Sequence, residues 1–352
     1  MNEAWNLLGW NDQLEAARQA YDKEWKPARV VLEHKHMYKV LDENGELLAT
    51  PSGKFRQQGD FPAVGDWVLV DARHEEGKAT IHALLPRKSK FSRNEAGVVT
   101  KEQIVAANVD YVYLVMALNQ DYNLRRLERY LLAAYDSGAV PVIILSKGDL
   151  CSDVEAKLLE VEAIAPGVDV HITSAVGRRG VDAISNQLTA GITAAFLGSS
   201  GAGKSTLVNL LYGKEVQLAG DIRKDDGKGR HTTTHRELIQ LPGGGMVIDT
   251  PGMRELQLWD QRQSGMSAAF SDIEELGDEC RFRDCTHRNE PGCRVQEAVE
   301  SGGLEAERLH SYFKLQRELR YLDTKSSAKA QLEQRKQFKQ LSKSVKQVKK
   351  RR

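Results

Sequence analysis

The chain carries a phosphate-binding pattern near its middle, LGSSGAGKST at residues 197–206. The pattern fits G-x-x-x-x-G-K-S and stands between a predicted strand and a predicted helix, as this motif requires. Glycines let backbone N–H groups curl around phosphates, and the helix N-terminus adds a positive dipole. We expect Lys204 to bridge the β- and γ-phosphates of a nucleotide, and Ser205 to ligate Mg²⁺. The candidate nucleotide-binding residues of this loop are Gly198, Ser199, Ser200, Gly201, Ala202, Gly203, Lys204, Ser205 and Thr206.

Two further patterns downstream fit the γ-phosphate side of such a site. An apolar strand is predicted to end in DTPG at residues 249–252, where Asp249 can hold Mg²⁺ through water and the Gly252 N–H can face the γ-phosphate. Between the two loops lies GRHTTTHRE at residues 229–237, and one threonine hydroxyl there would complete the Mg²⁺ shell when the triphosphate orders the loop. Of Thr232, Thr233 and Thr234 we favour Thr233. The candidate catalytic residues are Lys204, Thr233, Asp249 and Gly252.

A guanine-reading pattern stands upstream of the phosphate loop, although it follows that loop in an ordinary GTPase. Ser146, Lys147, Gly148 and Asp149 end one predicted strand, and Ser174 and Ala175 end the next. Asp149 would accept hydrogen bonds from the guanine N1 and exocyclic amine, Lys147 would pack across the base, and the Ala175 N–H would meet the carbonyl oxygen. In an ordinary GTPase the five motifs follow one another as the phosphate loop (1), the switch threonine (2), Asp-x-x-Gly (3) and the two guanine-reading motifs or boxes (4 and 5). Here the five boxes run in the order 4-5-1-2-3, which is a circular permutation. Strands pair by position in the sheet, so permutation costs the fold little.

These motifs place the sequence among known GTPases. The chain resembles the ribosome small subunit-dependent GTPase A family (RsgA, also called YjeQ) over nearly its whole length. The resemblance implies an OB barrel, a permuted GTPase domain and a zinc-binding C-terminal domain, with a role in late maturation of the small ribosomal subunit. The matching stretches are SGK at 52–54, PAVGDWV at 62–68, NVDYVYLVMALNQDYNLRRLERYL at 108–131, GRHTTT at 229–234, DTPGMRE at 249–255 and CRFRDCTHRNEPGCRV at 280–295.

Three of the four cysteines cluster near the C-terminal end of the chain. Cys280, Cys285, His287 and Cys293 supply three thiolates and one imidazole, a closed set for tetrahedral Zn²⁺. In a reducing compartment such a cluster favours metal over disulfides. We expect one structural Zn²⁺ here and no catalysis. The interleaved arginines could contact RNA phosphates or form a solvated basic face; they are Arg281, Arg283, Arg288 and Arg294.

The periodicity of the chain predicts a multidomain α/β protein. Strand patterns split by Asn44-Gly45, a strong hairpin signal, indicate a small OB-type barrel, and alternating strands and helices from Asp110 onward indicate a parallel sheet covered on both faces. We divide the chain into an N-terminal helical extension (1–25), an OB-fold RNA-binding barrel (26–92), a circularly permuted GTPase domain (93–260), a zinc-binding helical domain (261–324) and a basic tail (325–352).

Composition and charge favour a soluble cytoplasmic protein with a polyanionic partner. The start lacks a basic-then-apolar signal pattern, and no stretch is apolar for the roughly 18 residues of a membrane span. The tail carries eleven Lys or Arg and one acid, a net charge of +10, so the other 324 residues carry −9 of the chain's total of +1. We expect the barrel, the arginine-rich loop and the tail to contact RNA phosphates. The family resemblance implies that this RNA is the 16S rRNA of the small (30S) subunit, where other late assembly factors also bind. Nothing in the sequence demands more than a monomer.

Two positions depart from the common GTPase pattern. Ser146 replaces the usual Asn, and a hydroxyl makes fewer structural hydrogen bonds than an amide, so nucleotide affinity should be lower. Met253 replaces the Gln that orients water in Ras-like enzymes, so intrinsic turnover should be slow. His231, His235 or the ribosome could supply the missing group.

The prediction from sequence is a GTPase that hydrolyses GTP to GDP and phosphate on the small subunit, with turnover stimulated by the ribosome. One rival is an rRNA-binding placeholder in which hydrolysis is incidental, which Met253 keeps open. The other is an ATP-using enzyme such as a kinase, against which the guanine-reading loops argue.

Overall fold

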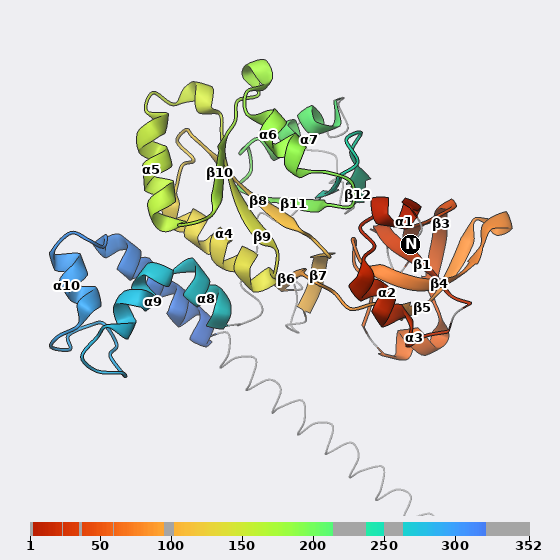
Figure 1. Cartoon of the computed structure of the whole chain (residues 1–352), viewed down its shortest axis with the longest axis horizontal. Helices are drawn as coiled ribbons and strands as arrows, with labels where there is room; N and C mark the ends of the chain where they lie inside the picture. Colours follow the sequence, from red (N-terminus) through yellow and green to blue (C-terminus); the bar gives the residue numbers. More distant parts are fainter. Residues whose placement is uncertain are drawn as a thin grey trace, which may run out of the picture. The chain divides into compact units, whose positions relative to one another are not determined.

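The computed structural model describes residues 3–22, 24–34, 37–58, 60–94, 102–213, 237–249 and 263–321. The chain divides into two compact units, with the boundary between Asp260 and Gln261. In the described part of the first unit, eleven strands form one sheet in the order β10-β9-β8-β11-β13-β12-β1-β2-β3-β5-β4 (Figure 1). Five of these strands, β1 to β5, form a barrel, and the other six form the sheet of an α/β domain.

The N-terminal half of the first unit is the predicted barrel. Its strands run antiparallel except for the parallel pair β3–β5, and β1 pairs with β4 to close the wall. The predicted hairpin at Asn44-Gly45 is present, and Asp42 Oδ1 accepts from both of its amides. Alternate residues point inward and pack around Tyr38, Val40 and Ile81. The elements are β1 (Lys26–His34), β2 (Met37–Asp42), β3 (Gly45–Pro51), α3 (Gly53–Gln58), β4 (Trp67–Arg73), η1 (His74–Glu76) and β5 (Lys78–Leu84).

The N-terminal extension differs in detail from the single helix that the sequence suggests. It forms two short helices, α1 (Glu3–Leu7) and α2 (Asp12–Arg18). Gly9 separates them with φ of 88°, and a Cβ there would lie 2.7 Å from the carbonyl oxygen of Gly191. The Asn11 side chain then accepts from the Leu14 N–H and starts α2. The break comes from this close backbone approach, which the local sequence does not show.

The second half of the first unit is an α/β sheet. Strands β10, β9, β8, β11 and β13 are parallel, as predicted, but β12 is antiparallel to β13 because only residues 241–245 connect them. So short a connection permits a hairpin and not a crossover. The strands are β8 (Tyr111–Ala117), β9 (Val140–Ser146), β10 (Asp169–Ile172), β11 (Thr193–Leu197), β12 (Glu237–Gln240) and β13 (Met246–Asp249).

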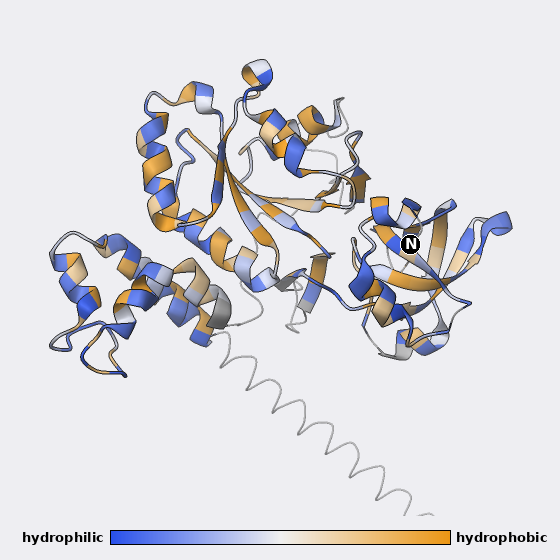
Figure 2. Cartoon of the chain, in the orientation of Figure 1, coloured by the Kyte–Doolittle hydropathy of each residue, from blue (hydrophilic) through white to orange (hydrophobic). Residues whose placement is uncertain are grey.

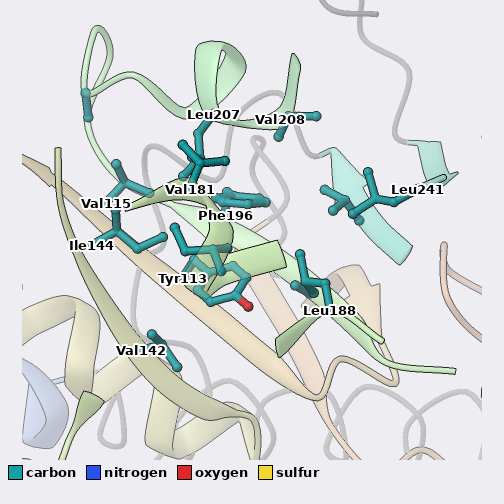
Figure 3. Packing of buried hydrophobic residues seen from close by; sticks show 14 residues of the cluster. Tyr113, Val115, Val142, Ile144, Val181, Leu188, Phe196, Leu207, Val208 and Leu241 are labelled. Atoms are coloured by element: carbon teal, nitrogen blue, oxygen red, sulfur yellow. The ribbon is translucent and has the colours of Figure 1, made fainter. Parts of the chain in front are cut away.

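Helices cover both faces of this sheet, α4 and α5 on one side and α6 and α7 on the other (Figure 1). The central strands β8, β9 and β11 are mainly apolar (Figure 2), as burial on both faces requires, whereas the edge strand β10 contains Asp169 and His171. Figure 3 shows Phe196 of β11 packed among side chains of α6 and α7, including Val181 and Leu207. The helices are α4 (Leu124–Ser137), which is capped by Gly138, α5 (Val154–Ile164), α6 (Val181–Gln187) and α7 (Lys204–Tyr212).

A two-stranded ribbon that the sequence did not reveal joins the two halves. It consists of β6 (Lys90–Asn94) and β7 (Glu102–Ala107), which pair antiparallel. The carbonyl oxygen of Val64 in the barrel accepts from the Ala107 N–H at the end of β7.

The second unit is helical. It contains α8 (Gln263–Ala269), α9 (Ser271–Asp278), α10 (Arg294–Glu300) and a further helix over residues 306–321. Arg308 is almost fully buried and donates to both carboxylate oxygens of Asp272 at 2.6 and 2.7 Å, while its guanidinium lies 4.8 Å from the ring centroid of Phe270. In the parts of the chain listed above, no helix is long and apolar enough to span a membrane.

Candidate nucleotide site and metal centre

The phosphate loop lies between the end of β11 and the start of α7, as its sequence indicates. Gly201 and Gly203 take φ of 77° and 94°, which side-chain-bearing residues rarely adopt. A Cβ on Gly198 would lie 2.3 Å from the carbonyl oxygen of Val115. These glycines therefore allow the loop to turn tightly against β8 and leave its centre to backbone N–H groups.

The lysine of the loop curls back over its own backbone. Lys204 Nζ donates to the carbonyl oxygens of Gly198 at 2.7 Å and of Ser199 at 2.6 Å. Ser205 and Thr206 follow it, half-buried, in the first turn of α7. An ammonium, hydroxyls and N–H groups thus converge at one helix N-terminus, which is the arrangement that binds phosphates.

The guanine-reading loop is held in shape by the loop after β10. Lys147 takes φ of 58°, and a short 3₁₀ turn, η2 (Gly148–Leu150), carries Asp149. Ser174 Oγ donates to Asp149 Oδ1 at 2.5 Å, and the Gly148 N–H donates to the carbonyl oxygen of Thr173 at 3.0 Å. One oxygen of the carboxylate is thereby oriented, and the structure brings the two predicted guanine boxes together.

Ser146 joins this loop to the phosphate loop. The Ser146 side chain is buried, and its Oγ donates to the carbonyl oxygen of Ala202 at 2.6 Å across 56 residues of sequence. Because Ser146 replaces the usual Asn, the sequence predicts a lower nucleotide affinity. The hydroxyl makes a hydrogen bond that links the two loops to each other.

Asp121 belongs to the site, although the sequence did not single it out. It lies in the loop after β8, where its carboxylate contacts the Ser199 hydroxyl of the phosphate loop and receives Arg126 Nη2 at 2.8 Å. The carboxyl ends of parallel strands meet at one edge of a sheet, and this rule was the available signal.

Part of the predicted site lies outside the described residues. This holds for Thr232, Thr233, Thr234, Gly252 and Met253, and for His231 and His235. Asp249 is the last residue of β13, which pairs directly with β11, the strand that ends at Leu197 and leads into the phosphate loop.

A second site lies in the helical unit. Sulfur atoms of Cys280, Cys285 and Cys293 and a ring nitrogen of His287 all lie within 4.8 Å of one another. The Nδ1 atom of His287 is 3.6 Å from the sulfurs of both Cys280 and Cys293, which are 3.9 Å apart. Four soft or borderline donors converge on one point, as a metal centre requires.

Glu290 shapes the loop that presents His287. Its carboxylate accepts from Thr286 N and Oγ1 and from the N–H groups of Arg288 and Asn289. These hydrogen bonds lower the pKa of Glu290 to about 2, with Thr286 the main cause. His287 itself takes φ of 58°, and Gln296 Nε2 donates to its carbonyl oxygen at 2.6 Å. A chain of polar contacts thus orients the one imidazole of the cluster.

Comparison with known proteins agrees with this geometry. The sequence model of the RsgA GTPase family matches residues 84–259, half of the chain. The chain is 48% identical to the small ribosomal subunit biogenesis GTPase RsgA of Opitutus terrae and 46% identical to RsgA 1 of Oceanobacillus iheyensis. These alignments cover 89% of both chains in the first case, and 90% of this chain and 91% of the relative in the second. The chain belongs to the RsgA GTPase family.

Solved structures support the membership. YjeQ from Thermotoga maritima matches with a TM-score of 0.63 and 30% identity over 85% of this chain and 98% of its own. YloQ, described as a circularly permuted GTPase, matches with a TM-score of 0.63 and 26% identity over 86% and 96%. A model of ABC transporters also matches residues 181–350, a range that includes the phosphate loop but begins after both guanine boxes. Like other RsgA GTPases, the chain is therefore a circularly permuted GTP hydrolase.

Proposed function

We propose that this GTPase acts on the small ribosomal subunit during late maturation and hydrolyses GTP to GDP and phosphate there. Its relatives are small ribosomal subunit biogenesis GTPases by name. The observation that carries the proposal is the bond between Ser146 Oγ and Ala202, because it assembles guanine-reading and phosphate-binding loops into one site.

The site has the hydrogen-bond acceptors and donors that a guanine nucleotide needs. The free oxygen of Asp149 would accept from guanine N1 and its amine, Lys147 would cover the base, and the Ala175 N–H would meet the carbonyl oxygen. Phosphates would take the place of the two carbonyl oxygens that Lys204 now contacts. Ser205, at the first turn of α7, would ligate Mg²⁺ together with Thr233, and the ion would neutralise the phosphate charge.

We propose that turnover is completed on the ribosome. Lys204, Thr233, Asp249 and Gly252 would act on the γ-phosphate, but Met253 cannot orient a water molecule because its side chain is apolar. Slow intrinsic hydrolysis and stimulation by the small subunit follow.

We propose that the second unit holds one structural Zn²⁺. With Zn–S near 2.3 Å and Zn–N near 2.05 Å, a tetrahedral site has S···S and S···N edges of about 3.8 and 3.6 Å. The distances among Cys280, His287 and Cys293 are 3.9 and 3.6 Å, which match these edges, and the Cys285 sulfur lies within 4.8 Å of all three, so the four residues would hold the ion. Four protein donors leave no open position for catalysis.

We propose 16S rRNA as the main contact within the subunit, and other late assembly factors as neighbours there. The barrel, the arginines around the zinc ligands and the +10 tail support this, and subunit maturation implies a cytoplasmic location. The five-domain division given above and a monomeric state are part of the same proposal.

Phosphate release from GTP, with and without purified small subunits, tests the proposal beside an Asp149→Asn control. We expect strong stimulation by the subunit that ATP does not reproduce and that the Asp149→Asn variant loses. If the protein binds the small subunit tightly in a nucleotide-dependent way but its GTP hydrolysis is not stimulated, it is instead an rRNA-binding placeholder that is controlled by which nucleotide is bound and not by turnover.

A further inference from the structure

The barrel is joined to the GTPase sheet at β12, which pairs with β13, the strand that ends at the predicted Asp-x-x-Gly box. Strand β1 pairs with β2 and β4 inside the barrel, and its Leu32 also pairs with Glu237 of β12. Glu237 in turn pairs with Asp249 of β13. One row of backbone therefore runs from the barrel to Asp249, and two strand spacings make it roughly 10 Å long.

Arg29 of β1 lies at this seam and is 1% exposed. Its guanidinium donates to the carbonyl oxygens of Gly65 at 3.3 Å, Asn108 at 3.2 Å and Leu8, and to Met246 Sδ at 3.4 Å. These partners come from the barrel, from the segment before β8, from the N-terminal extension and from β13. Burial lowers the pKa of Arg29 to about 10, with Asp110 and Asp66 opposing the shift, so the side chain stays charged at neutral pH.

A second contact presses the barrel directly against β13. Gly65 takes φ of 93°, and a Cβ there would lie 2.9 Å from Ile248 Cδ1 and 2.1 Å from the carbonyl oxygen of Ala107. Ile248 is the residue before Asp249. The turn that accepts from Arg29 therefore also touches the strand that presents the Asp-x-x-Gly box.

We propose that Arg29 is a positioning residue of the GTPase site, which sets strand β13, and hence Asp249, from the barrel. The inference rests on the nucleotide site proposed above. In the site proposed above, the Asp-x-x-Gly box that begins at Asp249 faces the γ-phosphate, which GDP lacks, whereas Mg²⁺ accompanies both nucleotides. Loosening β13 should therefore weaken binding of the triphosphate more than binding of GDP. A partner whose binding moves the barrel should therefore change the relative affinity for GTP and GDP through the same contacts.

The test compares Arg29→Lys with wild type in the full chain, without ribosomal subunits. Lysine keeps the charge, but its single ammonium cannot reach four acceptors placed around a planar guanidinium. We measure affinity for GDP and for a non-hydrolysable GTP analogue with Mg²⁺. The ratio of the two affinities should move at least about fivefold toward GDP, with GDP affinity itself nearly unchanged.

Arg56→Lys is the matched control, because Arg56 also donates to a barrel carbonyl, that of Pro51, but is exposed on α3. It should leave the ratio unchanged. A folded Arg29→Lys protein with the wild-type ratio would overturn the proposal, as would an equal loss of affinity for both nucleotides.

Met246→Leu decides the matter if Arg29→Lys does not fold. It conserves volume while removing the sulfur that faces Arg29, and volume-conserving core changes are well tolerated. A smaller shift in the same direction supports the proposal, and no shift overturns it. Since ribosomal subunits are absent, either result leaves the role at the small subunit to its own test.

Discussion

At the scale of single residues, the hydrogen bond from Ser146 Oγ to the carbonyl oxygen of Ala202 should contribute to nucleotide affinity, although Ser146 stands where most GTPases have Asn. Ser146→Ala leaves the carbonyl oxygen of Ala202 without this donor and frees the two loops from each other. We expect affinity for GTP and GDP alike to fall by about three- to tenfold, the effect of one hydrogen bond. Titration with a fluorescent nucleotide measures this, and unchanged affinity would show that the loops need no such link.

Asp149 should decide which base is bound. Asp149→Asn replaces a carboxylate oxygen by an amide that cannot accept from both guanine donors. Two charge-assisted bonds are worth about 3 kcal/mol or more together, so GTP affinity should fall by about 100-fold. Asp153→Asn is the control, because Asp153 caps α5 four residues away and Asn caps helices equally well. Competition binding with GTP and ATP reads out both variants.

At the scale of elements, the loop of residues 286–290 is predicted to control metal retention. Glu290→Ala removes the acceptor of four hydrogen bonds that shape this loop, so His287 should lose its fixed orientation. Loss of a group that orients a metal ligand typically lowers metal affinity by about 10- to 100-fold. Zinc release to a chromogenic chelator should be faster by a comparable factor. Glu297→Ala, which removes only an exposed ion pair with Arg294, should release zinc at the wild-type rate.

The helices of the second unit depend on one buried arginine. Arg308→Ala removes two bonds to Asp272 and the stacking on Phe270. Hydrogen bonds to charged groups contribute about 1.5–3 kcal/mol, so we expect the free energy of unfolding of this unit to fall by about 2–3 kcal/mol. Denaturant unfolding followed by zinc release measures it. Arg294→Ala breaks an exposed ion pair and should leave the free energy of unfolding nearly unchanged.

At the scale of the whole molecule, the charge asymmetry predicts how the protein meets RNA. Deleting residues 325–352 removes a net charge of +10 and leaves −9 on the remainder. Affinity for the small subunit should fall, and its dependence on salt should become shallower, because fewer phosphates are neutralised. Binding measured from 50 to 200 mM salt tests this. An unchanged salt slope would show that the tail does not contact RNA, while intrinsic GTP hydrolysis should be unaffected.

The local features of the fold were predictable wherever a short stretch carries its own signal. The hairpin at Asn44-Gly45 and the strand before Gly198 are confirmed. The break at Gly9 and the reversed direction of β12 were not predicted. Both depend on what a distant segment or a short connection allows, which no local pattern reports.

The sequence by itself determined the chemistry of this protein. Glycines, a lysine and hydroxyls at fixed spacing indicate a phosphate loop, because such a loop is formed by residues that are neighbours in the sequence. The order of the boxes along the chain indicates the permutation. Only the tertiary structure decided how these parts are joined. Ser146 meets Ala202, Asp121 reaches the phosphate loop and Arg29 connects the barrel to β13. Such contacts between residues far apart in the chain arise from the packing of the sheet, so spacing along the sequence cannot reveal them.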